Sequence, residues 1–194
     1  MSPNLWRLLD WIETQGDKMN PDMRIAINSN LGAKQSIIDR FKKKLKGFKN
    51  FHLYTSCEAT FGQAEYIRDG IVYGDWFSNF LHMMVDKVPS EIHNMCTINA
   101  LCLESLPELL EKMVWFKSAS KVYGPKVNYT LNILRFPSFQ SPLVLPDDLR
   151  NKFKGDIQKF LNNNVKHLEH MEVNQTQRLI DYLDVVKTPH AGAA

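Results

Sequence analysis

The chain has 194 residues, of which 44% are apolar, a composition that suits one α/β domain with a sizeable core. Its 24 basic and 21 acidic residues leave a net charge of +3, which calls for neither a nucleic-acid nor a membrane partner. No apolar run approaches the roughly 18 residues of a membrane-spanning helix, and the first ten residues lack the pattern of a signal peptide. We therefore expect a cytoplasmic protein.

Helical and strand patterns alternate along the chain. The elements predicted, in chain order, are a helix over 4–14, a strand over 23–28, a helix over 34–46, a strand over 51–55, an irregular stretch over 56–73, a helix capped by Asp75 and stopped by Pro89, a strand over 92–98, a helix through 106–113, a strand over 127–134, a long helix capped by Asp147 or Asp148, and a last helix near 173–186. Such alternation predicts a parallel sheet built of right-handed crossovers.

Polar residues gather where the predicted strands end. Residues 28–30, 55–58, 97–99 and 135–137 follow the four strands in turn. Parallel sheets bind their ligands at the carboxyl ends of the strands. We call the edge of the sheet formed by these strand ends the rim, and a binding pocket is therefore expected along it.

The sequence holds no self-contained catalytic motif. Phosphate loops, dinucleotide fingerprints, paired-histidine zinc motifs and nucleophile elbows are missing, so an ordinary hydrolase is disfavoured and no catalytic or metal-binding residue is assigned. His52 and His93 fall within strands, where we interpret them as structural. The three cysteines are too dispersed for a disulfide framework. Cys96 is expected in the core, whereas Cys57, at a strand end, keeps a functional role open.

Five stretches of the sequence occur in the order found in one family of enzymes. They are AINSNLG at 26–32, TSCEAT at 55–60, AEYIRDG at 64–70, TINALCLESL at 97–106 and NILRFPSFQSPLVLPDDLR at 132–150. In these stretches the chain resembles the twitch-domain-containing radical SAM proteins.

The resemblance implies a partial (β/α)₆ barrel. In that family a C-x-x-x-C-x-x-C loop holds a 4Fe–4S cluster, which cleaves S-adenosylmethionine to a 5′-deoxyadenosyl radical, and a Gly-Gly-Glu-Pro motif grips the methionine end. Neither motif occurs here. Residues 1–186 are therefore expected to form strands three to six of the barrel, with 187–194 as a disordered tail, and the chain alone is expected to hold no cluster.

The resemblance also implies which residues contact S-adenosylmethionine. Ser56 and Arg68 match family positions that contact its ribose and carboxylate. Asn99 and the segment from Leu134 to Phe136 lie where the family contacts ribose and adenine. Asn30 is expected to face the same pocket.

Several interpretations of the whole chain remain open. It is expected to be a fragment of a radical SAM enzyme that is inactive alone, a split subunit whose missing N-terminal segment or partner chain supplies the cluster, or a non-catalytic binding or assembly module that kept the scaffold. An exposed sheet edge at 23–28 predicts self-association.

Overall fold

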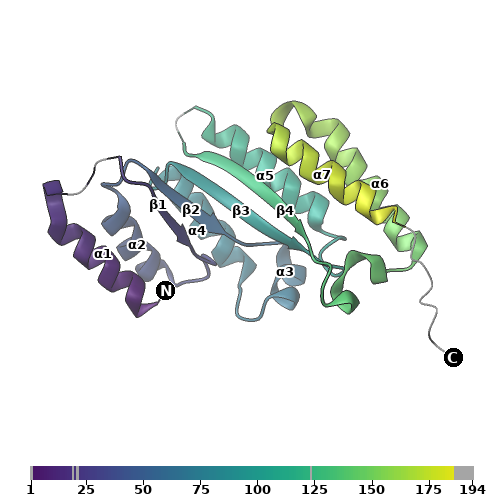
Figure 1. Ribbon diagram of the computed structural model, residues 1–194, viewed down its shortest axis with the longest axis horizontal. Coiled ribbons are helices and arrows are strands. Elements are labelled where there is room, and N and C mark those ends of the chain that lie inside the picture. Colours follow the sequence, from purple (N-terminus) through teal and green to yellow (C-terminus); the bar gives the residue numbers. More distant parts are fainter. Residues whose placement is uncertain (1, 19, 21, 123, 186–194) are drawn as a thin grey trace.

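A computed structural model of the protein describes residues 2–18, 20, 22–122 and 124–185 (Figure 1). The tail expected to be disordered, 187–194, lies outside the described residues, as does residue 186, the expected end of the domain.

Among the described residues, four strands form one parallel sheet, as predicted, and their spatial order follows the chain. The strands are β1 (Ile25–Asn28), β2 (Phe51–Thr55), β3 (Glu91–Ile98) and β4 (Lys126–Ile133). Each is rich in β-branched or aromatic residues, which favour extended backbone. The α/β class and the parallel sheet flanked by helices are thus confirmed.

In the part of the chain that the structure describes, seven α-helices connect and flank the strands. They are α1 (Pro3–Gln15), α2 (Gln35–Leu45), α3 (Phe61–Ile67), α4 (Tyr73–Val85), α5 (Leu106–Ser120), α6 (Asp147–Asn164) and α7 (His170–Leu183). At the first of them, α1 packs against α2 through an edge-to-face contact between Trp6 and Phe41, whose ring centroids are 6.5 Å apart.

Three expectations about helices were wrong in detail. Residues 56–73 contain α3, which the sequence hides because this helix is short and no side chain caps its start. Val72, not Asp75, is the N-cap of α4, and Asp75 lies in the first turn. Pro146 is the N-cap of α6, so Asp147 also lies in the first turn, where a carboxylate favours the helix dipole.

The two faces of the sheet differ in cover. Along β3, buried residues alternate with more exposed ones: Ile92 and Cys96 on one face are fully buried, whereas Thr97 on the other is exposed. In Figure 1 the strands run in front of α4 and α5. Parallel sheets usually bury both faces. We call the less covered face, whose residues include Asn28, Tyr54, His93, Thr97 and Asn132, the open face.

The edge of the sheet at β4 is closed by α7 (Figure 1). The carboxylate of Glu172 accepts a hydrogen bond from the Tyr129 amide at 3.0 Å. Gln175 accepts from the Leu131 amide at 2.7 Å, and Arg178 donates to the Leu131 carbonyl at 2.9 Å. Side chains therefore satisfy backbone groups that another strand would otherwise bind.

The edge at β1 has no such cover in the described part of the chain. The amides of Ile25 and Ser29 donate to carbonyls of the β2 segment. Because alternate residues of a strand turn opposite ways, the backbone groups of Ala26 and Asn28 point away from β2. Both residues are exposed.

Candidate functional site

Glu58 and Arg68 join the carboxyl ends of β2 and β3. Arg68 donates to both carboxylate oxygens of Glu58, from Nε at 2.6 Å to Oε2 and from Nη2 to Oε1. The Thr97 amide also donates to Oε1, at 3.4 Å. Glu58 is only 3% exposed, so this carboxylate is held where the two strands end.

The partner of Arg68 differs from those that its neighbours in sequence suggest. A surface arginine in this stretch would pair with Glu65 or Asp69, but Glu65 instead accepts a hydrogen bond from the Tyr73 amide at 2.9 Å. The hydrogen bonds to Glu58 raise the pKa of Arg68, so the guanidinium stays charged. Its side chain is 32% exposed.

Among the described residues, no hydrogen bond occupies the second edge of the Arg68 guanidinium. Glu58 occupies the edge formed by Nε and Nη2. The edge formed by Nη1 and the second Nη2 proton has the fork geometry that binds a carboxylate through two bonds. Ser56, half-buried, lies two residues before Glu58 at the end of β2.

Asn99 shapes the loop that follows β3. Its Oδ1 accepts hydrogen bonds from the Leu101 amide at 2.9 Å and the Cys102 amide at 3.2 Å. Its Nδ2 donates to the Thr97 carbonyl at 3.4 Å. The Asn99 amide is therefore engaged with its own loop, next to the strand end that Glu58 contacts.

The remaining residues predicted for the site lie at the ends of the two outer strands. Asn30, after β1, is exposed and accepts from the Gly32 amide at 3.2 Å. After β4, Leu134 is half-buried and donates its amide to Ile98, whereas Phe136 is 85% exposed. No hydrogen bond between described residues joins these three to Ser56 or Arg68.

The cysteines do not fit an iron–sulfur cluster. Cys57, Cys96 and Cys102 are fully buried, and each thiol donates to a backbone carbonyl at 3.1–3.2 Å. Burial raises the pKa of Cys57 and of Cys102 to about 12, and that of Cys96 well above its ordinary value. Cluster ligands are thiolates, so these thiols are core groups, including Cys57.

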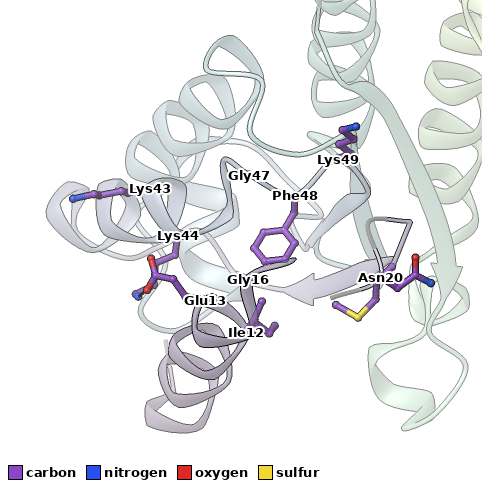
Figure 2. Close-up of a pocket in the computed structure, with 10 residues that line it drawn as sticks. Ile12, Glu13, Gly16, Asn20, Lys43, Lys44, Gly47, Phe48 and Lys49 are labelled. Atoms are coloured by element: carbon purple, nitrogen blue, oxygen red, sulfur yellow. Dashed lines mark hydrogen bonds and ion pairs between the residues drawn. The ribbon is translucent and has the colours of Figure 1, made fainter. Parts of the chain in front are cut away.

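A cavity of about 550 Å³ lies at the other end of the sheet, and Figure 2 shows the residues around it. It is lined by Ile12, Glu13, Gly16, Asn20, Met23, Lys43, Lys44, Gly47, Phe48 and Lys49. Lys44 pairs with Asp10 at 2.6 Å and with Glu13 at 2.8 Å, so its charge is balanced. The cavity borders the segment that enters β2, whereas Ser56 and Arg68 follow that strand.

The structure also brings His52 and His93, which we interpreted from the sequence as structural, together with Glu91. His52, Glu91 and His93 bring their ligand atoms within 4.8 Å of one another on the open face. Glu91 and His93 are two residues apart, which places both side chains on one face of a strand. That spacing is a signal in the sequence, but the adjacency of His52 depends on strand register.

Comparisons with known proteins find no family model, no curated protein and no solved structure that matches this chain. Within the described residues, no helix is both long and apolar enough to cross a membrane.

Proposed function

We propose that this chain is part of the wall of a radical SAM-type barrel and that its rim binds S-adenosylmethionine. The observation that carries the proposal is the Arg68 guanidinium, fixed by Glu58 at the ends of β2 and β3 with one edge left for a ligand. The open sheet face supports it, because the inner face of a barrel is the face that helices leave uncovered. The sequence resemblance supplies the ligand.

In this proposal each residue has a limited task. Arg68 binds the methionine carboxylate through its remaining edge. Ser56 offers a hydroxyl that both donates and accepts, as a ribose requires. Asn99 holds the loop beside the ligand, and Asn30, Leu134 and Phe136 stand at the outer ends of the rim, where Phe136 presents an aromatic ring to adenine.

The cluster of the resembling family would supply the electron that cleaves S-adenosylmethionine. Since the three buried cysteines do not fit it, we derive no step through a cluster in this chain. In the split-subunit form of the proposal, a segment or chain that pairs with β1 supplies the cluster. It also supplies the Gly-Gly-Glu-Pro motif that binds the methionine end of S-adenosylmethionine.

A non-catalytic assembly module is the second candidate, favoured by the same fully buried thiols. Anaerobic reconstitution with iron and sulfide tests the cluster assignment. We expect no stable four-iron cluster in this chain. Stoichiometric iron with the charge-transfer absorption of a cluster would contradict the expectation that this chain holds no cluster.

Binding of S-adenosylmethionine tests the proposed function itself. Titration followed by protein NMR should shift resonances of Ser56, Arg68 and Thr97, with a Kd near the millimolar range, because only part of the ligand is held. Arg68→Ala should weaken binding about tenfold or more, since a hydrogen bond to a charged group contributes about 1.5–3 kcal/mol.

Arg40→Ala is the matched control, because Arg40 is exposed on α2 and stacks on Trp6 away from the rim. This variant should bind as the parent does. Equal binding by the parent and Arg68→Ala, or no shift at all at saturating ligand, would overturn the proposal.

A further inference from the structure

Two histidines and a glutamate meet on the open face near the amino ends of β2 and β3. The sheet register pairs His52 with Glu91 and places Tyr54 beside His93. Glu91 Oε2 lies 2.8 Å from His93 Nε2 and 3.6 Å from His52 Nδ1. One carboxylate oxygen therefore stands between two imidazole nitrogens that come from neighbouring strands.

The hydrogen bonds around His52 fix which nitrogen faces the carboxylate. Asn50 donates its Nδ2 to the Asp22 carbonyl at 3.3 Å, so its Oδ1 is the acceptor for His52 Nε2 at 3.1 Å. His52 Nε2 then carries the proton, and Nδ1 presents a lone pair. Nδ1 is buried and has no hydrogen-bond partner in the described part of the structure.

A lone pair facing a carboxylate is an arrangement that a cation stabilises. The side chain of His52 is only 10% exposed, so water compensates poorly for the missing partner. Nearby, Asn128, in register with His93, also has a buried oxygen without a partner. The described residues thus leave two acceptors unsatisfied on one small area of the sheet.

The distances suit a small transition-metal ion. Ligands at 2.0–2.1 Å from a tetrahedral zinc ion stand about 3.3 Å from one another, a value that lies between the two measured separations. Two imidazoles and one carboxylate favour a borderline ion such as Zn²⁺ over Ca²⁺ or Mg²⁺, which prefer sites made of oxygen ligands alone.

A supporting layer already holds the ligands in place. The side-chain oxygen of Asn50 orients His52 by accepting a hydrogen bond from its Nε2, as partners of metal-bound histidines commonly do. Tyr54 stacks on the ring of His93 with centroids 4.7 Å apart, and Arg24 donates to the Tyr54 hydroxyl at 2.9 Å. Arg24 is a cation near the cluster, and its charge opposes the binding of a metal ion. Lys126, which is in register with Glu91 on the neighbouring strand, pairs with Glu169 at 3.7 Å, so its charge is partly balanced.

We propose that His52, Glu91 and His93 form a zinc-type divalent metal site that joins β2 to β3. The ligands are His52 Nδ1, Glu91 Oε2 and His93 Nε2. When the metal binds, the proton that His93 Nε2 donates to Glu91 is given up to solvent, and the neutral ring carries its one proton on Nδ1. The site stands toward the amino ends of the strands, away from the Arg68 rim. Its role is to stabilise the sheet, and the proposal does not rest on binding of S-adenosylmethionine.

Equilibrium dialysis of the untagged chain against Zn²⁺, read by elemental analysis, tests the site. We expect one zinc per chain and a higher unfolding temperature with zinc than with a chelator. Glu91→Gln, nearly isosteric, should weaken binding about tenfold or more. Asn50→Ala should weaken it roughly 10- to 100-fold, as loss of an outer-layer partner does.

His170→Ala is the matched control, because His170 is an exposed residue at the start of α7 and its side chain contacts only Asn174 among the hydrogen bonds of the described residues. Co²⁺ substitution gives a second readout. The parent should show the visible bands of cobalt bound by nitrogen and oxygen, and Glu91→Gln should lose them. Zinc bound equally by the parent and Glu91→Gln, or loss of zinc in His170→Ala alone, would overturn the proposal.

Discussion

The two edges of the sheet are built differently. At β4, three side chains of α7 bind the outer backbone groups of Tyr129 and Leu131. At β1, the outward groups of Ala26 and Asn28 meet no comparable cover in the part of the chain described here. An edge closed by side chains cannot accept another strand, whereas an open one can. Of the two edges of the described sheet, only the β1 edge therefore leaves outward backbone groups to which an added strand could bind.

The largest effect is expected at Glu172, the centre of the closed edge. It is fully buried, pairs with Lys117, and accepts from the amides of Tyr129 and Glu169. Glu172→Ala leaves the Lys117 charge buried and unpaired, so the free energy of unfolding should fall by about 3–5 kcal/mol. Urea denaturation measures this change.

Glu13→Ala provides the matched control for that loss. Glu13 pairs with Lys44 at 2.8 Å, but its side chain is 69% exposed, so the change should stay within about 1 kcal/mol. Similar losses in the two variants would show that Glu172 is not a special contact of the closed edge.

A smaller effect is expected at Gln175, which binds the Leu131 amide. Gln175→Ala leaves that amide without its partner and should lower the free energy of unfolding by about 1–3 kcal/mol. Gln177→Ala, on the same helix, removes only an exposed contact with Asp181. It should leave stability nearly unchanged, and an equal loss in both would mean that edge closure contributes nothing.

The open edge is tested by proline. Ala26→Pro removes an outward amide that strand addition would use, at little cost to pairing with β2. If the chain self-associates through β1, the dissociation constant should rise about three- to tenfold, the effect of one hydrogen bond. Sedimentation equilibrium measures it, with Ala26→Thr, which keeps the amide, as control. Unchanged association in Ala26→Pro would place the contact elsewhere.

Much of this architecture follows from local pattern. The four strands lie where β-branched and aromatic runs predicted them, because buried strands in parallel sheets are strongly apolar. The ends of helices were less predictable: α3 lacks a side-chain cap, and Asp75 marks a first turn instead of a cap.

Contacts between distant segments could not be predicted. Glu58 is ten residues from Arg68, and it also accepts a hydrogen bond from the Thr97 amide of another strand. The closure of β4 by α7 joins residues more than forty positions apart. Such contacts depend on register and helix placement, which the periodicity of single segments does not encode.

Hydrogen exchange of individual amides tests the difference between the two edges most directly. Followed by NMR on the native protein, the amides of Tyr129 and Leu131 should exchange slowly, because side chains of α7 bind them in the folded state. Under dilution that prevents association, the amides of Ala26 and Asn28 should exchange almost as fast as in an unfolded chain. Equal protection of the two pairs in the monomer would contradict the account of one closed and one open edge.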